Sequence, residues 1–401
     1  MAFMFMPMLR VAARPQILTN ASLRLGTRSY GQVAAVSNVF QEALHATSPR
    51  TDWTREQISE IYNQPLMELA FASGTVHRRF HDPAAIQMCT LMNIKTGGCS
   101  EDCSYCAQSS RYQTGLKATK IVTVESVLKA AKVAKDNGST RFCMGAAWRD
   151  MRGRKTNLKS ITEMVKGVQA LGLESCVTLG MMDEAQAKEL KDAGLTAYNH
   201  NVDTSREHYP NVITTRSYDE RLKTIDNVHK AGIKVCTGGI LGLGEEAKDH
   251  VGLIHTVATL PAHPESFPVN TLVPIEGTPM FKVTRVKFDA VVRTIATARM
   301  VMPKTIIRIA AGRIDMSEEK QVLCFMAGAN AIFTGEKMLT TACSGWEQDL
   351  EMFKRWGLIP MKAHVEPALR EQIEPLKKDE QMVPEMLLHQ MNPSKHPKVT
   401  L

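Results

Sequence analysis

The sequence lacks the features that mark several large classes of protein. No run of 18 apolar residues occurs, so no membrane-spanning segment is expected. No HExxH motif or histidine cluster, no GxSxG turn and no kinase signature is present, which leaves a zinc hydrolase, a serine hydrolase and a protein kinase unsupported. The composition, 44% hydrophobic and 22% charged residues, excludes a mostly disordered, collagen-like or polytopic membrane chain.

The net charge of +8 would suggest an acidic partner if the excess lay on one folded face. Half of it lies instead in the first 50 residues, which contain five arginines and a single acid, Glu42. The rest of the chain is therefore nearly balanced, and no nucleic-acid partner is expected.

Both ends of the chain differ in composition from the middle. Residues 1–32 contain four arginines, several Ser and Thr, no acid and no Lys, which is typical of an organelle transit peptide, although a flexible basic tail would have the same composition. The triplet Arg28-Ser29-Tyr30 resembles a mitochondrial processing site. Residues 363–401, rich in Pro, Lys and Glu, have the composition of a mostly disordered tail. We expect a mitochondrial matrix protein with a transit peptide and flexible leader over 1–50 and a folded region over 51–362.

The middle of the chain alternates short apolar runs with amphipathic helical patterns. Such repeats predict a parallel sheet, either doubly wound or closed into a barrel. The strands are expected at residues 86–94, 140–146, 174–180, 197–203, 234–241, 267–273, 306–312 and 331–335. Eight strands over roughly 250 residues favour a (β/α)8 TIM-type barrel. A helical preface is expected at 53–71, and a helix at 350–358 should follow the last strand.

Glycine ends the predicted helices between the strands. The ends are expected at Asn137-Gly138, Leu171-Gly172, Ala193-Gly194, Ala231-Gly232 and Ala327-Gly328. Glycine adopts the left-handed conformation that commonly ends a helix. Ser217 and Glu220 form a capping-box pattern at the start of another helix.

Nine cysteines are spread along the chain, an odd set that argues against a disulfide scaffold and for reduced thiols or metal ligands. Cys99, Cys103 and Cys106 form a CxxxCxxC motif in a loop after the first predicted strand. Thiolates at this spacing suit an iron–sulfur cluster or zinc. Three thiolates on a four-iron cluster leave one iron free to bind another molecule, which indicates chemistry rather than electron transfer alone.

Three further cysteines and one arginine lie within predicted strands. They are Cys143, Cys176, Cys236 and Arg308. Small or weakly polar residues mostly follow each of them on the same strand face, which predicts an interior cavity rather than the usual packing of branched aliphatic side chains. An inward arginine also needs an anionic partner. Cys89, Cys324 and Cys343 lack this context and are interpreted as packing residues.

Polar residues occupy a strand where aliphatic side chains are expected. Asn199, Asn201 and Asp203 share one face by alternation, and Asn270 holds a similar place in the sixth strand. These side chains predict hydrogen-bond partners for a polar small molecule, unless the face lies outward under a helix. The glycine-rich segment from Gly238 to Glu245 lacks a complete phosphate-binding motif and indicates only a close backbone approach.

The segments GGCSEDCSYCAQSSRY, RFCMGAAWR, AYNHNVDTS, GGILGLGE and RIAAGR together resemble the biotin synthase family of radical S-adenosylmethionine enzymes. The likeness covers about residues 52–360. It implies that Cys99, Cys103 and Cys106 hold a 4Fe-4S cluster whose open iron binds S-adenosylmethionine. It also implies a 2Fe-2S cluster at Cys143, Cys176, Cys236 and Arg308.

The resemblance assigns further residues to small-molecule contacts. Those expected to contact S-adenosylmethionine are Tyr105, which could stack on it or simply pack, Asn201, Asp203, Gly238, Ile240, Gly242 and Glu245. Those expected at the dethiobiotin site are Asn199, Asn201 and Asn270. The implied reaction inserts sulfur from the 2Fe-2S cluster into dethiobiotin after 5′-deoxyadenosyl radicals remove hydrogen.

The same resemblance implies a ferredoxin- or flavodoxin-type electron donor, iron–sulfur assembly machinery and a homodimer. Two alternatives stay open at this point: another radical S-adenosylmethionine enzyme, or a non-catalytic iron–sulfur or zinc protein. The strand residues Cys143, Cys176, Cys236 and Arg308 distinguish them, because neither alternative requires that set.

Overall fold

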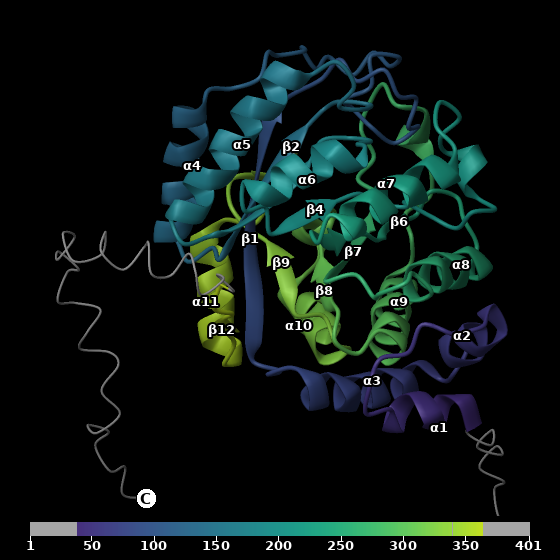
Figure 1. Ribbon diagram of the computed structural model, residues 1–401. Helices are drawn as coiled ribbons and strands as arrows, with labels where there is room; N and C mark the ends of the chain where they lie inside the picture. The colour runs from purple at the N-terminus through teal and green to yellow at the C-terminus, as the bar shows by residue number, and fades with distance from the viewer. Residues whose placement is uncertain (1–37, 339, 364–401) are drawn as a thin grey trace, which may run out of the picture. The chain divides into compact units, whose positions relative to one another are not determined.

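Eight parallel strand positions close into a barrel in the computed structural model, which describes residues 38–338 and 340–363 (Figure 1). The strands are β1 Ala85–Lys95, β2 Arg141–Ala146, β3 Glu174–Thr178, β4 Ala197–Asn199, β5 Lys234–Cys236, β6 Gly239–Leu241, β7 Ser266–Thr271, β8 Ile306–Ile309 and β9 Ala331–Phe333. β9 pairs with β1, and this pairing closes the sheet. The predicted (β/α)8 barrel is therefore confirmed.

The fifth strand position is divided into β5 and β6, where a single strand over 234–241 was expected. Both halves pair with β7, but the pairing is interrupted opposite Pro268. Proline has no N–H to donate to the ladder. Gly238 lies there, and a Cβ on it would be 2.2 Å from the Pro268 carbonyl oxygen. The fourth strand is also shorter than expected and ends at Asn199, which leaves residues 200–203 as irregular backbone at the barrel mouth.

Helices alternate with the strands around the outside of the barrel. They are α4 Val124–Asp136, α5 Lys155–Ala170, α6 Glu184–Asp192, α7 Tyr218–Lys230, α8 Ala247–Ala258, α9 Phe288–Val301, α10 Glu318–Met326 and α11 Trp346–Trp356. The five predicted glycine ends and the Ser217 capping box are confirmed. α11 begins four residues before the predicted helix. Short 3-10 helices lie at Tyr209–Asn211, Pro279–Lys282 and Arg313–Asp315.

Three helices precede the barrel and lie at the end where β1 begins (Figure 1). They are α1 Asn38–His45, α2 Arg55–Tyr62 and α3 Leu66–Phe80. The single expected helix at 53–71 is divided at Pro65, the residue that precedes α3. α1 lies inside the stretch expected to be a leader, yet Phe40 and Ala43 are buried, so the folded region begins at residue 38 or earlier. Residues 1–37 and 364–401, which carry most of the predicted leader and tail, lie outside the described residues.

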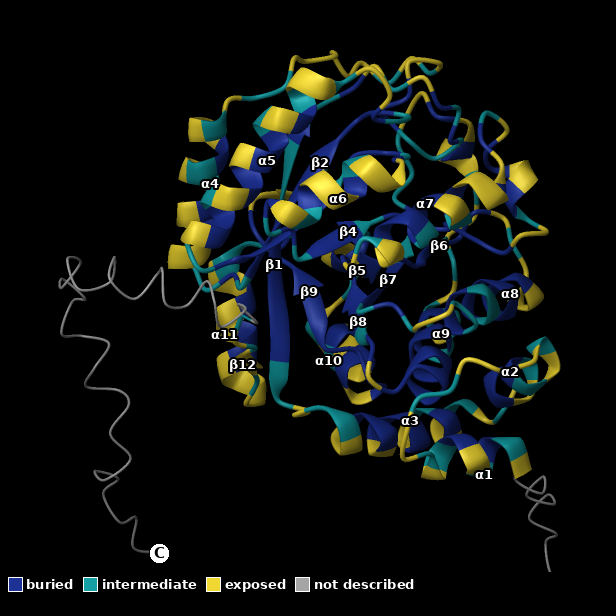
Figure 2. Ribbon diagram, in the orientation of Figure 1, coloured by how far each residue is buried: buried dark blue, intermediate teal, exposed yellow. Residues whose placement is uncertain are grey.

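Burial follows the barrel architecture: the strands are almost entirely buried, while the helices expose their outer faces (Figure 2). β12 Ile359–Pro360 extends the sheet beside β1, and β10 Lys337–Met338 and β11 Thr341–Ala342 form a short hairpin. Within residues 38–338 and 340–363, no helix is long and apolar enough to cross a membrane. The barrel interior is unusual in its sulfur content, since a buried cluster combines cysteines with small side chains.

Candidate active site

A cavity of about 300 Å³ opens at the carboxyl end of the strands, which is where barrel enzymes place their chemistry. It brings together many of the predicted site residues. Those lining it are Cys99, Cys103, Tyr105, Cys106, Asn199, Asn201, Asp203, Ile240 and Asn270. Gly238, Gly242 and Glu245 do not line this cavity. The residues that were far apart in the sequence thus converge on one site from five different loops and strands.

The loop that carries Cys99, Cys103 and Cys106 is shaped by its own backbone. Cys99 exchanges backbone hydrogen bonds with the far side of the loop, donating to Gln108 at 3.0 Å and accepting from Ser110 at 2.8 Å. The Cys106 N–H donates to the Cys103 carbonyl at 2.9 Å. These bonds hold the three thiols on one compact turn.

Burial sets the protonation state of these thiols. It raises the pKa of Cys99, Cys103 and Cys106, that of Cys106 to about 11. Protonated thiols are weak ligands, so metal binding at this loop has to release protons. Three thiols on one loop fit a metal cluster, because its iron ions supply enough positive charge to displace the thiol protons.

Two acidic residues between the cysteines anchor the loop to the opposite side of the barrel mouth. Asp102 accepts backbone hydrogen bonds from Thr214 and Thr215 at 3.0 and 3.1 Å, and Glu101 lies 3.6 Å from Arg149. Burial alone would raise the pKa of Asp102, but the hydrogen bonds from the threonines outweigh it and lower the pKa to about 2. The sequence interpretation overlooked this anchor, although both acids lie inside the motif.

Asp203 connects the cysteine loop to the barrel wall. It accepts a hydrogen bond from the Tyr105 hydroxyl at 2.8 Å and forms a buried ion pair with Arg221 of α7 at 2.5 Å. Burial alone would lower the pKa of Arg221, yet the Asp203 charge raises it. Asp203 is also the one non-glycine residue of the described part with a positive φ, +70°. Such strain is found mostly where function requires a side chain in one place.

The asparagines at the cavity also tie the strand ends together. Asn201 accepts from the Gly238 N–H at 3.2 Å, and Asn270 links the Gly239 carbonyl at 2.9 Å to the Ala311 N–H at 3.1 Å. Asn199 lines the cavity from the last position of β4. The amides of Asn201 and Asn270 are therefore held in fixed orientations at the wall, as recognition of a polar ligand requires.

Glu245 does not line this cavity, and its contact with S-adenosylmethionine stays a prediction. Its Oε1 accepts from the Gly242 N–H at 2.6 Å and lies 2.9 Å from His250 Nε2. Glu245 and Gly242 line a second cavity, on the other side of the glycine turn. The carboxylate thus holds the turn that follows β6, the strand that carries the cavity-lining residue Ile240.

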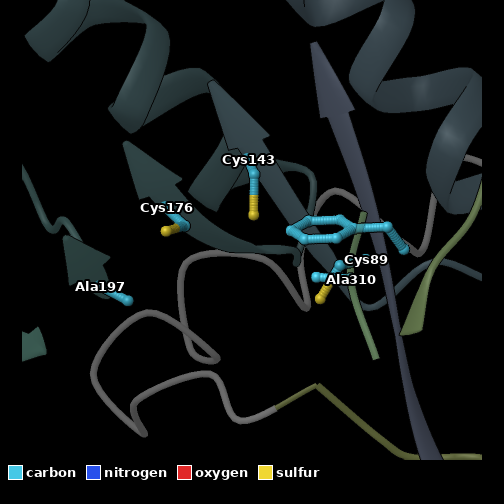
Figure 3. Packing of buried hydrophobic residues seen from close by; sticks show 6 residues of the cluster. Cys89, Cys143, Cys176, Ala197 and Ala310 are labelled. Carbon is cyan, nitrogen blue, oxygen red and sulfur yellow. The ribbon is translucent and has the colours of Figure 1, made fainter. Parts of the chain in front are cut away.

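The second predicted set lies inside the barrel, and Figure 3 shows two of its members, Cys143 and Cys176. Cys143 of β2 and Cys176 of β3 are directly opposite each other in the strand pairing. Cys236 of β5 lies 3.9 Å from Arg308 Nη1, and all four residues are at most 5% exposed. Strand pairing therefore gathers three thiols and one guanidinium in a single buried place.

Arg308 has no carboxylate partner in the described part of the chain. Its nitrogens donate to neutral groups, Ser266 Oγ at 3.0 Å and Gln87 Oε1 at 2.5 Å, and its buried Nε has no hydrogen-bond partner. A buried cation calls for a negative charge nearby. An anionic iron–sulfur cluster held by the adjacent thiols would supply it, so the residues present fit such a group.

Cys89, interpreted from the sequence as a packing residue, lies in the same buried cluster as two of these thiols. Cys89 lies on β1 and is fully buried. The other members of its cluster come from other parts of the barrel, and Figure 3 shows the Cys89 sulfur among them: Cys143, Cys176, Ala197, Ala310 and Phe333. Alternation along β1 places Gln87, Cys89 and Leu91 on one face. That face was readable from the sequence, but the larger Leu91 and Asn93 follow Cys89 where small residues follow the other thiols.

A single metal ion is a poorer match for these thiols than a cluster. Among the described residues, no three His, Cys, Asp or Glu side chains come close enough to hold one ion. The ligands of an iron–sulfur cluster are held apart by the cluster itself.

Comparisons with known proteins agree with this geometry. Residues 93–257 match the radical SAM superfamily, and residues 268–359 match the biotin and thiamin synthesis associated domain. Mitochondrial biotin synthase of Emericella nidulans is 65% identical over 355 residues, 86% of this chain and 90% of the relative. The mitochondrial biotin synthases of Saccharomyces cerevisiae and Arabidopsis thaliana are 59% and 53% identical, each over 88% of this chain and over 96% and 94% of the relative.

Solved structures share the fold at low identity. Methylornithine synthase superposes with a TM-score of 0.67 at 18% identity, covering 81% of this chain and 97% of that one. The hydrogenase maturase HydG superposes with a TM-score of 0.69 at 17% identity, covering 83% and 76%. These likenesses concern the barrel alone.

Proposed function

The chain belongs to the biotin synthase family of radical S-adenosylmethionine enzymes, and we propose that it converts dethiobiotin to biotin with one cluster at each thiol set. One observation carries this proposal. The cavity that holds Cys99, Cys103 and Cys106 lies at the mouth of a barrel whose interior holds Cys143, Cys176, Cys236 and Arg308. A substrate in this cavity would lie between a site that generates radicals and a site that stores sulfur.

The outer thiols are assigned to a 4Fe-4S cluster and the inner set to a 2Fe-2S cluster. When bound, the first supplies the electron that cleaves S-adenosylmethionine, and the second supplies the sulfur. Of the residues expected to contact S-adenosylmethionine, Tyr105, Asn201, Asp203 and Ile240 surround the cavity and support that role. Gly238, Gly242 and Glu245 do not line the cavity, but the Gly238 N–H donates to the cavity residue Asn201 and the Gly242 N–H donates to Glu245, so their contact with S-adenosylmethionine stays part of the proposal.

The chain itself contributes position and exclusion of water. Asn199, Asn201 and Asn270 present amide groups to the cavity, which suits the ureido group of dethiobiotin because each amide both donates and accepts hydrogen bonds. Asp203, fixed by Arg221, holds the Tyr105 hydroxyl against the wall. The barrel shields a reactive carbon radical from bulk water.

Product analysis tests the proposal. Protein reconstituted with iron and sulfide without oxygen, and then given S-adenosylmethionine, a reductant and dethiobiotin, should yield 5′-deoxyadenosine, methionine and biotin. Formation of 5′-deoxyadenosine without biotin, with both clusters intact, would refute the substrate assignment and leave the radical chemistry standing.

The proposal also includes delivery of electrons by a ferredoxin- or flavodoxin-type protein. Arg111, Lys117 and Lys120 are exposed beside the cysteine loop and form no ion pair in the described part of the chain. Thr119 bonds to Thr96, the residue before the Gly97-Gly98 turn, at 2.9 and 3.0 Å, which keeps this basic segment next to the cluster loop. An acidic donor would be attracted to that surface.

Import into the mitochondrial matrix, a homodimer and dependence on iron–sulfur assembly machinery complete the proposal. Relatives named as mitochondrial support the location, and the arginine-rich composition of residues 1–32 supports a transit peptide. Fusion of residues 1–50 to a fluorescent protein tests it: the fusion should enter mitochondria, and a fusion in which the four arginines of residues 1–32 are replaced by Gln should not.

A further inference from the structure

The inner site contains a thiol that the proposed ligand set does not use. Cys89 is fully buried on β1, in one cluster with Cys143 of β2 and Cys176 of β3. Figure 3 shows the three thiols in this region of the barrel.

Cys89 also lies next to Arg308. Both side chains donate to one oxygen, Oε1 of Gln87: Arg308 Nη2 at 2.5 Å and Cys89 Sγ at 3.6 Å. The Gln87 amide is held in this orientation because its Nε2 donates to Glu174 at 3.2 Å. Burial alone would lower the pKa of Arg308, but the neighbouring thiols of Cys89, Cys236 and Cys143 raise it.

Ligand chemistry makes this arrangement unstable toward exchange. A guanidine is a hard and weakly coordinating group, whereas thiolate sulfur is the usual ligand of iron in these clusters. The chain therefore places a stronger ligand beside a weaker one and lets both share a hydrogen-bond acceptor.

We propose that Cys89 is a reserve ligand of the inner site, taking the place of Arg308 on iron when Arg308 is not bound. The inference rests on the proposed function, because it assumes that the inner residues hold a 2Fe-2S cluster. In the exchange the Cys89 S–H bond breaks, its proton passes to the guanidine nitrogen that leaves iron, and a sulfur–iron bond replaces the nitrogen–iron bond. Charge is conserved, and no oxidant or reductant takes part.

Cys324 shows what a packing cysteine looks like in this molecule. It is fully buried on α10, and burial alone raises its pKa to about 12, with no thiol or arginine acting on it. Cys89 is equally buried, but its thiol donates to Gln87 and lies near the charge of Arg308. Cys324 therefore provides the matched control.

Cluster content after anaerobic reconstitution with iron and sulfide tests the reserve ligand. Arg308→Met, Arg308→Met/Cys89→Ser and Arg308→Met/Cys324→Ser are compared with the unaltered protein by iron and sulfide per chain and by absorption and Mössbauer spectra. The 4Fe-4S signal of the outer loop reports in every sample that the barrel has folded. Arg308→Met and its Cys324→Ser partner should keep the 2Fe-2S signal, and the Cys89→Ser double variant should lose it by about tenfold or more.

Two results would overturn the inference. If Arg308→Met loses the cluster as completely as the Cys89→Ser double variant, Cys89 does not act as a ligand. If the double variant retains the cluster, three cysteines suffice. Failure of the proposed function would look different. The unaltered protein would then show no 2Fe-2S signal, or that signal would persist in Cys143→Ser, Cys176→Ser and Cys236→Ser.

Discussion

The two ends of the barrel solve the problem of buried charge in opposite ways. At the amino end, Arg141 is completely buried between Glu174 and Glu265, at 2.6 and 2.5 Å, so its charge is matched by carboxylates of the protein. At the carboxyl end and in the interior, thiols and Arg308 are buried without such matching. Buried polar groups that have no partner within the protein mark the place where a cofactor can bind and supply that partner.

Two buried arginines sharpen this contrast. Arg299, like Arg308, has no carboxylate partner among the described residues, but its nitrogens donate to four backbone or amide oxygens, including Gly328 at 2.8 Å and Pro303 at 2.7 Å. Burial lowers its pKa to about 9. Arg308 instead keeps an unpartnered Nε and a thiol neighbour. The first arginine is satisfied by structure alone, and the second is prepared for an anion.

The largest expected effect separates the outer thiols from the inner ones. Cys103→Ser should abolish both 5′-deoxyadenosine and biotin, because the radical-generating cluster loses a ligand. Cys176→Ser should abolish biotin but still permit 5′-deoxyadenosine formation, because only the sulfur source is lost. Chromatography of both products from reconstituted protein measures the split. Equal loss of both products in Cys176→Ser would mean that the two sites do not act separately.

Stability should depend on the amino end instead. Arg141→Met removes the buried cation that pairs with Glu174 and with the half-buried Glu265, which should lower the free energy of unfolding by about 3–5 kcal/mol. Urea denaturation of the cluster-free protein measures it. Lys120→Gln, an exposed change at the carboxyl end, should stay within about 0.5 kcal/mol. Comparable losses in both variants would contradict the division of the barrel into a stabilising end and a functional end.

Acid should weaken the same end. Burial and the charge of Arg299 lower the pKa of His81 to about 4. The unfolded chain therefore binds more protons than the folded chain between pH 6.5 and 4, so stability falls as pH falls through that range. The loss should reach up to about 3 kcal/mol. Urea denaturation of cluster-free protein at several pH values should show a shallower slope for His81→Gln and an unchanged slope for the exposed control His229→Gln.

Local signals made the barrel predictable. Apolar runs, glycine ends and the Ser217 capping box each depend on neighbours in the sequence; the glycine ends and the capping box were found as expected, and the apolar runs located all eight strand positions. The break opposite Pro268 was not predictable, because it depends on which residue of β5 or β6 faces that proline. Strand register is a property of two distant segments together.

The candidate site divides in the same way. Cys99, Cys103 and Cys106 are evident from spacing, and the inner thiols from alternation along their strands. Arg221 was overlooked because an arginine on a helix usually faces solvent, and only the tertiary fold buries it against Asp203. Cys89 was overlooked because its strand carries larger neighbours, and its meaning comes from Gln87 and Arg308, 221 residues apart in sequence.

The smallest expected effect concerns the rim of the functional end. Lys117→Gln/Lys120→Gln removes two exposed charges beside the cysteine loop without touching the cavity. Turnover driven by an acidic ferredoxin should fall by about tenfold at low salt, because electrostatic attraction mainly accelerates association, and the difference should shrink as salt screens the charges. Turnover driven by dithionite should be unchanged, since a small reductant needs no docking surface. Lys188→Gln, an exposed change on α6 away from the loop, is the matched control. An equal loss with dithionite would show that these lysines support the loop itself, and no loss with ferredoxin would place the donor on another face.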